Sequence, residues 1–95
     1  MKGFKDVRKE LLAALHQGRY QHESRKDINI KNQLATGEVA PETVALIVQS
    51  CQGGEHSWSP HHFDTSVDVH LIKRQGWYIK FYFLDPLTIF ISVHR

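Results

Sequence analysis

The spacing of apolar residues changes once along this chain, and that change constrains the fold more than any other feature. Up to about residue 52 the apolar residues recur at helical spacing, whereas from residue 66 onward they alternate with polar ones. Val67, Val69 and Leu71, for example, alternate with Asp68 and His70. A chain with helices first and strands last is typical of an α+β fold, in which N-terminal helices pack on one face of a C-terminal antiparallel sheet.

Three helices are predicted in the first half of the chain. Gly18, Gly37 and Gly53 stand where these helices should stop, because glycine readily takes the left-handed conformation of a helix end. Pro41 suits the first position of the last helix. The expected helices are residues 4–17, about 25–35 and 41–51.

The chain contains one cysteine, Cys51, so no internal disulfide can form. A single cysteine fits a reducing cytoplasm. Cys51 continues the apolar stripe of Val44 and Val48, which indicates a small buried hydrophobe rather than a nucleophile. No apolar run approaches the ~18 residues of a membrane-spanning helix, and the first residues lack the apolar segment of a signal peptide. We therefore expect one cytoplasmic domain over residues 1–95, with no membrane contact.

The second half is expected to form a three-stranded meander. Residues 55–65 are polar, contain several histidines and include Pro60, and they are predicted to form a loop. β-branched and aromatic residues then predict strands over residues 66–73, 77–84 and 88–94. A further edge strand near residues 19–23 would make a fourth.

One face of this sheet must be apolar to meet the helices, and this requirement predicts the strand register. In the last hairpin an apolar face results from pairing Phe83 with Ile89, Phe81 with Ile91, and Ile79 with Val93, with residues 85–87 as the loop. In the preceding hairpin it results from pairing Leu71 with Ile79, Val69 with Phe81, and Val67 with Phe83, with residues 74–76 as the loop.

The opposite face of the sheet then gathers polar side chains. Tyr78 is expected opposite His94, and Lys80 between His70 and Ser92. The same row is expected to continue with Asp68, Tyr82 and Phe90. A phenol, an ammonium group and two imidazoles in one place suit acid–base chemistry at neutral pH, although a polar outer face is also what solvation alone would require.

Three segments of the chain resemble the end of the MqsR-type toxins of bacterial toxin–antitoxin pairs, which belong to the RelE-like group of messenger-RNA interferases. The segments are Asp68-Val69-His70, Gly76-Trp77-Tyr78-Ile79-Lys80 and Ile89-Phe90-Ile91-Ser92-Val93-His94. The resemblance implies a RelE-like fold and an endoribonuclease that cleaves mRNA without a metal or other cofactor. It also implies two partners, single-stranded RNA and a cognate antitoxin protein.

Carried over by position, Tyr78 matches a catalytic tyrosine of that family. His94 stands where the family has a catalytic lysine, and His56 at or beside another functional lysine. Val67 occupies a position near which the family has a glutamine. Histidine exchanges protons near neutral pH, whereas lysine mainly supplies charge. The two replacements therefore imply a site of stronger acid–base character or one that has lost the family's activity.

In the mechanism that this resemblance implies, the ribose 2′-hydroxyl attacks the adjacent phosphate. His94 and His56 are the expected acid–base pair, and Tyr78 would orient the phosphate or assist as an acid. Lys80 and Arg95 would neutralise the charge that develops on phosphorus.

Three further residues are expected to bind the substrate. His70 is predicted beside Lys80, and Trp58 and Tyr82 would stack on unpaired bases, as aromatic side chains do in proteins that bind single strands. Trp77 precedes the alternating face and is expected to cover the edge of the core instead.

Two other readings stay open. The aromatic side chains of the exposed sheet face would also suit a small, non-catalytic domain that docks a protein. Alternatively, the histidines would supply ligands to a bound metal ion, since imidazole suits zinc, although their spacing matches no closed zinc motif. The residues considered for a metal are His56, His61, His62, His70 and Asp64.

Overall fold

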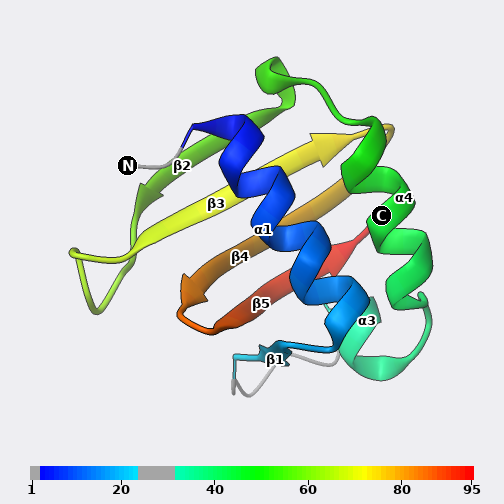
Figure 1. The fold of residues 1–95 in the computed structure, drawn as a ribbon, viewed down its shortest axis with the longest axis horizontal. Helices are drawn as coiled ribbons and strands as arrows, with labels where there is room; N and C mark the ends of the chain where they lie inside the picture. The colour runs from blue at the N-terminus through cyan, green and yellow to red at the C-terminus, as the bar shows by residue number, and fades with distance from the viewer. Residues whose placement is uncertain (1–2, 24–31) are drawn as a thin grey trace.

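The computed structural model describes residues 3–23 and 32–95 and shows an α+β fold in which two helices lie across a sheet (Figure 1). Its elements follow one another in the order helix, strand, two helices and four strands, with a 3₁₀ turn before the second strand. They are α1 (Phe4–Gln17), β1 (Tyr20–His22), α3 (Gln33–Thr36), α4 (Pro41–Ser50), η1 (Gly53–Glu55), β2 (His56–Pro60), β3 (Asp68–Arg74), β4 (Trp77–Leu84) and β5 (Leu87–His94).

The sheet has five strands in the order β1-β5-β4-β3-β2. β1 runs parallel to β5, whereas the other neighbours are antiparallel. The expectation of three or four purely antiparallel strands is therefore wrong, although the α+β class and the edge strand near residues 19–23 are confirmed. The segment predicted as a loop contains β2, which pairs with β3. Pro60 favours a loop in the sequence pattern, but proline is tolerated in an edge strand such as β2.

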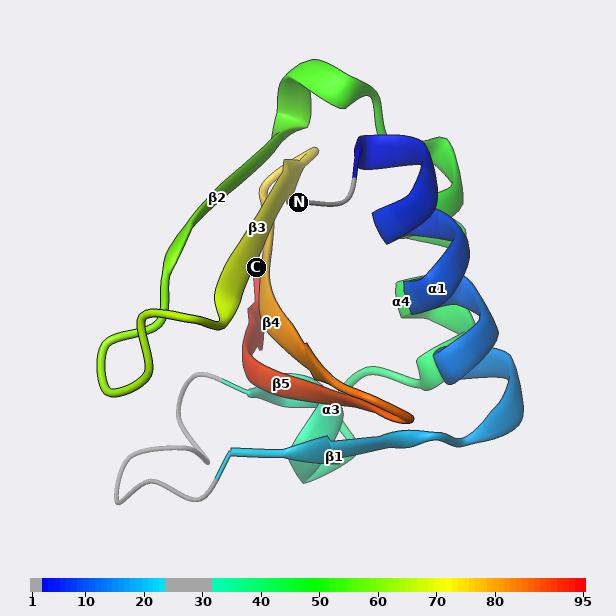
Figure 2. The same ribbon diagram turned by 60° about the vertical axis from the view of Figure 1, so that its left-hand side comes forward.

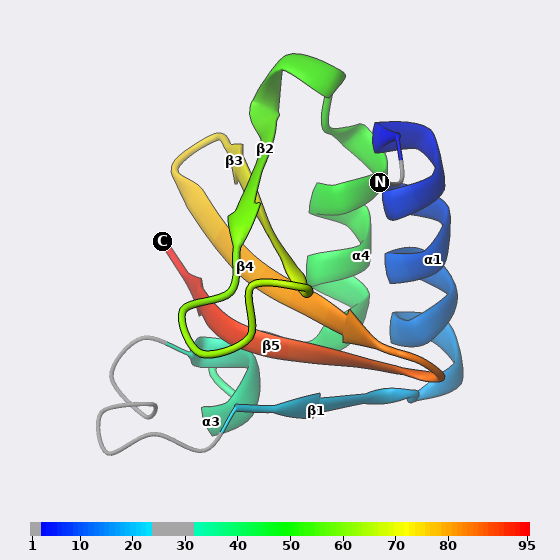
Figure 3. The ribbon, with the colours of Figure 1, turned by 90° about the vertical axis from the view of Figure 1, so that its left-hand side faces the viewer.

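Both long helices cover the same face of the sheet, as the views in Figures 2 and 3 show. α1 ends as predicted at Gly18, which has a φ of 70°. α4 begins as predicted at Pro41. Of the expected helix at residues 25–35, the described part forms only the short α3, which ends at Gly37 as predicted; residues 25–31 lie outside the described residues. Within the described ranges, no helix is both long enough and apolar enough to span a bilayer.

The hydrophobic core lies between these helices and the sheet. Helix side chains that are fully buried there include Val7, Leu11, Val44 and Val48. Burial of such side chains is the main favourable contribution to folding, at about 25 cal/mol per Å² of apolar surface. Facing them from the sheet are Ile72, Ile79, Phe81, Phe90 and Val93.

The β3–β4 hairpin is shifted by one residue from the predicted register. Arg74 pairs with Trp77, which leaves Gln75 and Gly76 as the turn. Both turn residues have positive φ, 50° and 85°, as a tight two-residue hairpin turn requires. The observed pairs include Ile72 with Ile79, His70 with Phe81, and Leu71 with Lys80. The shorter turn therefore moves every β3 side chain to the face opposite the one predicted.

The β4–β5 hairpin follows the predicted register over only part of its length. Tyr78 pairs with His94, Ile79 with Val93, and Lys80 with Ser92, as predicted. A β-bulge between Lys80 and Phe81 then shifts the pairing, so that Phe81 meets Phe90, Tyr82 meets Ile89, and Asp85 and Pro86 form the turn. An extra residue in one strand of a pair is what defines such a bulge, and here it is Ile91.

Candidate active site

The sheet has two faces, and the register assigns side chains to each. We call the face under α1 and α4 the helix face and the opposite one the outer face. Directly paired residues point to the same side of a sheet, and successive residues alternate. The outer face carries Val69, Leu71 and Lys73 from β3, Tyr78, Lys80 and Tyr82 from β4, and Ile89, Ile91, Ser92 and His94 from β5.

The closest contact among the predicted catalytic residues joins Tyr78 and His94. Their rings stack with centroids 5.0 Å apart and planes 17° apart. Both side chains are half-buried, so they remain accessible from the outer face. The Lys73 ammonium lies 6.0 Å from the centre of the Tyr78 ring, within the range of a cation–π contact. A phenol, an imidazole and a cation therefore meet at the start of β4, next to the β3–β4 turn.

Lys80 lies further along β4, between Leu71 of β3 and Ser92 of β5. The prediction that His70 flanks it is wrong, because the shorter β3–β4 turn places Leu71 there. The bulge also brings both Ile91 and Ser92 to the outer face. Lys80 is thus a positive charge in the middle of a sheet, bordered by apolar side chains and one hydroxyl.

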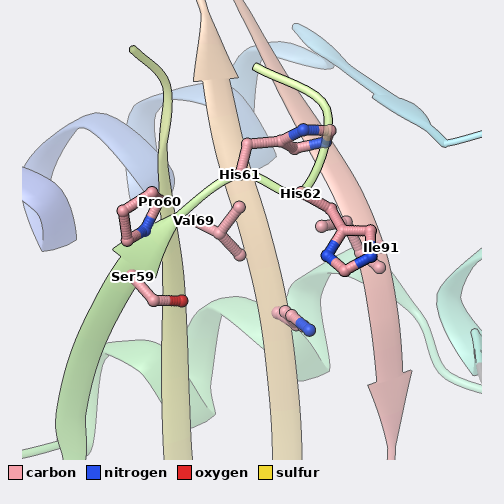
Figure 4. A pocket seen from close by; sticks show the side chains of 7 residues that line it. Ser59, Pro60, His61, His62, Val69 and Ile91 are labelled. Carbon is pink, nitrogen blue, oxygen red and sulfur yellow. The ribbon is translucent and has the colours of Figure 1, made fainter. Parts of the chain in front are cut away.

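A pocket of about 130 Å³ opens beside Lys80. Figure 4 shows Ser59 entering it from β2 and His62 from the segment that follows β2, on either side of Val69. Val69 and Ile91 contribute apolar surface and are themselves 5% and 3% exposed. Hydroxyl, imidazole and ammonium groups therefore converge on a small hollow that Val69 and Ile91 line in part.

The segment between β2 and β3 is held in place by His61. The Nδ1 atom of His61 accepts hydrogen bonds from the backbone N–H groups of Phe63 and Asp64, at 3.0 and 3.3 Å. Its ring meets the Tyr82 ring edge-on at 4.9 Å, and its Nε2 atom lies 3.8 Å from a carboxylate oxygen of Glu23. These contacts fix the segment over the outer face.

Tyr82 lies on the outer face as predicted for a base-stacking residue. It lines a second hollow, of about 140 Å³, together with His61, Asp64, Val67 and Leu84. Hydrogen bonds from the Ser66 hydroxyl and backbone N–H lower the pKa of Asp64, which keeps this carboxylate ionised near neutral pH.

The structure does not bring His56 and His70 to the outer face. His56 pairs with Ile72 and His70 with Phe81, so both lie on the helix face. The Nε2 atom of His56 lies 3.0 Å from the Nδ1 atom of His70. Burial lowers the pKa of His56. The expected pairing of His56 with His94, and the substrate contact expected of His70, are therefore not supported by the geometry.

These two histidines belong to a row of rings that crosses the helix face. Successive centroids lie 5.2 to 6.2 Å apart along the whole row. Rings at such separations are typical of aromatic packing in a core, so the row explains why two imidazoles can lie among apolar side chains. In order from β1 across the sheet to β2 and then to α1, its members are His22, Phe90, Phe81, His70, His56 and Phe4.

The structure places Arg95 against Trp77, and Trp58 on the side of the helix face. The Arg95 guanidinium lies 5.9 Å from the centre of the Trp77 ring, which covers the edge of the core as predicted. Trp58 is 46% exposed, but it pairs with His70 and thus points to the side of the helix face.

Two other residues that were predicted in the row around Lys80 lie elsewhere in the structure. Phe90 is fully buried against the helices. Asp68 pairs with Pro60 at the far end of β3. The bulge in β5 and the one-residue shift of β3 account for both differences.

Across residues 3–23 and 32–95, no three His, Cys, Asp or Glu side chains come together as a metal site would require. Cys51 is buried as predicted, donates its S–H to the Val48 carbonyl at 2.9 Å, and has its pKa raised by burial.

Sequence reasoning missed the side chains that line the pocket beside Lys80. The sequence predicts a loop at Ser59 and offers His62 only as a metal ligand. No spacing signal identifies them, because both reach the pocket through the pairing of β2 with β3. Comparisons of the chain with protein-family models, with curated proteins and with solved structures found no match.

Proposed function

We propose that this protein is a metal-independent endoribonuclease whose reaction centre lies on the outer face of the sheet. The observation that carries the proposal is the stacked pair of Tyr78 and His94, with two lysines at neighbouring positions of the same face. Lys73 approaches the Tyr78 ring, and Lys80 stands two residues further along β4. An imidazole, a phenol and two cations around one accessible spot suit cleavage of a phosphodiester.

The chemistry assigns one role to each group. His94 accepts the proton of the ribose 2′-hydroxyl, and the 2′ oxygen attacks phosphorus as the bond to the 5′ oxygen breaks. The Tyr78 hydroxyl donates its proton to that leaving oxygen, the role for which His56 was expected. The Lys73 ammonium group stabilises the added negative charge on the phosphorane, and Lys80 adds to the positive potential around it. The products are a 2′,3′-cyclic phosphate and a 5′-hydroxyl, and solvent restores the protons.

The outer face of the sheet also suggests which partners the protein binds. An open sheet surface of this kind accommodates single-stranded RNA, and Tyr82 offers a ring on which a base can stack. We further propose that the fold is RelE-like and that the chain is the toxin of a toxin–antitoxin pair, as the resemblance of its last strands implies. A cognate antitoxin would then inhibit by covering the outer face.

The test incubates purified protein with single-stranded RNA in EDTA and maps the ends produced. Wild-type protein should cleave and leave 2′,3′-cyclic phosphates. Tyr78→Phe and His94→Ala should each lose about 10²–10⁴-fold in rate, as expected on removal of a general acid or base. His16→Ala serves as the matched control, because His16 is an exposed histidine on α1. This variant should cleave RNA at the wild-type rate.

Circular dichroism of each variant shows whether it is folded, so that a lower cleavage rate is not caused by unfolding. Cleavage at an unchanged rate in both site variants would place the chemistry elsewhere. RNA that stays intact, with and without ribosomes, would reject the ribonuclease proposal.

A further inference from the structure

The pocket beside Lys80 has the chemistry of an anion site. Lys80 supplies a full positive charge, and the Ser59 hydroxyl and the His62 imidazole supply hydrogen-bond donors. Val69 and Ile91 are almost fully buried and line the same hollow. Charge interactions are stronger beside such apolar surface than in bulk water. The pocket therefore favours a group with several acceptor oxygens and a negative charge.

The size of the pocket limits what can enter it. Its volume of about 130 Å³ corresponds to about four water molecules at ~30 Å³ each. Sites for drug-sized ligands usually have ~300–1,000 Å³. A single phosphate group fits this space, whereas a nucleoside does not. A nucleotide bound here must hold its sugar and base outside the pocket.

An exposed aromatic ring stands next to the pocket. Phe63 follows His62 in the chain and is 86% exposed, the most exposed of the large apolar side chains described. Its ring meets the His62 ring edge-on, with centroids 5.5 Å apart. The hydrogen bond from its backbone N–H to His61 fixes the backbone that carries it. An exposed ring on a fixed stretch of backbone, beside a phosphate-sized hollow, is suited to stacking on a base.

We infer that Ser59, His62, Lys80 and Phe63 form a nucleotide-binding subsite for single-stranded nucleic acid, with one phosphate in the pocket and its base on Phe63. The substrate class rests on the proposed ribonuclease function. Lys80 and Tyr78 lie two residues apart on β4, or about 6.6 Å along the strand. A nucleic-acid strand that runs from the subsite along β4 toward Tyr78 reaches the Tyr78–His94 pair, and the subsite then positions the RNA for cleavage.

The subsite can be tested without any cleavage. Amide chemical shifts of ¹⁵N-labelled protein are followed while inorganic phosphate is added, and in a second series while a single-stranded deoxyoligonucleotide is added. The deoxyoligonucleotide lacks the 2′-hydroxyl nucleophile and so stays intact. Both ligands should shift the amides of Ser59, His62 and Lys80, and only the oligonucleotide should shift that of Phe63.

Variants separate the two parts of the subsite. Lys80→Gln should weaken binding of both ligands at least tenfold, and His62→Gln should weaken both to a smaller extent. Phe63→Ala should leave phosphate binding unchanged and weaken oligonucleotide binding about tenfold, as for one lost stacking contact. Two controls match these changes: Lys9→Gln removes an exposed charge on α1, and Leu46→Ala removes an exposed apolar side chain on α4.

The outcomes distinguish this inference from the proposed function. Shifts that map elsewhere, or that persist in Lys80→Gln, would overturn the subsite even if the protein cleaves RNA. Binding at the subsite by a protein that leaves RNA intact would support the subsite and reject the ribonuclease proposal.

Discussion

The Nε2 atom of His56 and the Nδ1 atom of His70 lie 3.0 Å apart between β2 and β3, and their rings stack at a centroid distance of 5.2 Å. A hydrogen bond between two imidazoles requires one nitrogen that donates and one that accepts. The accepting ring must therefore be neutral, and protonation of both rings would break the bond. His70 is only 3% exposed, so this bond ties the edge strand β2 to the core.

We predict that the protein loses stability as the pH falls below neutrality. Burial lowers the pKa of His56, and also that of His22, below the ordinary value of 6.5. The unfolded chain thus binds protons at a higher pH than the folded one, and the free energy of unfolding decreases from pH 7.5 to 5.5. The decrease ends once the pH drops below the folded-state pKa values. One proton contributes at most about 1.4 kcal/mol per pH unit.

Urea denaturation at the two pH values measures this effect. His56→Gln keeps a donor that can reach His70 but cannot titrate, so its stability should fall less between pH 7.5 and 5.5. An equal fall in wild type and variant would show that His56 does not contribute.

A second prediction concerns the role of His56 in cleavage. Because His56 lies on the helix face, His56→Gln should retain RNA cleavage within about threefold of wild type, whereas His94→Gln should lose about 10²–10⁴-fold. Rates are compared at pH 7.5 and at a temperature where circular dichroism shows both variants folded. A loss in His56→Gln as large as that in His94→Gln would contradict the assignment of faces.

The bulge in β5 leads to a third prediction. Without the bulge Phe90 would lie on the outer face, but in the structure it is fully buried. Phe90→Ala should therefore lower the free energy of unfolding by about 3–5 kcal/mol, the usual cost of removing a buried phenyl ring. Leu46→Ala, an exposed change on α4, should stay within about 0.5 kcal/mol of wild type. Equal effects of the two substitutions in urea denaturation would contradict the observed register.

A fourth prediction concerns the turn between β3 and β4. Gly76 has a φ of 85°, so Gly76→Ala should cost about 1–2 kcal/mol through strain in the left-handed region. Gln75 also has positive φ, at 50°, a conformation that asparagine adopts more readily. Gln75→Asn should therefore raise the melting temperature slightly. A melting temperature that rises in Gly76→Ala would show that the turn is not of this type.

The helices α1 and α4 could be predicted from the sequence because local signals define them. The apolar spacing from Phe4 to Leu15, the glycine at position 18 and the proline at position 41 each act within one or two turns. The pairing of Tyr78 with His94 was also predictable, since it follows from keeping a lysine out of the core.

The remaining strand register could not be predicted, because single residues decide it. One residue fewer in the β3–β4 turn places His70 on the helix face, and one extra residue in β5 buries Phe90. Polar and apolar pattern alone did not reveal that His70 can lie in the core beside another histidine. β2 is not predicted because it is mostly exposed and lacks an alternating apolar pattern, and only its pairing with β3 makes it a strand.

The parallel pairing of β1 with β5 has a consequence for how a newly made chain assembles. Tyr20 pairs with Thr88, so β1 leaves the ribosome long before its partner has been synthesised. β5 also lies between β1 and β4, so the sheet cannot close until β5 is available. Contacts between such distant segments form late and slowly. A nascent chain therefore cannot form the contact between Tyr78 and His94 until residue 94 has left the exit tunnel.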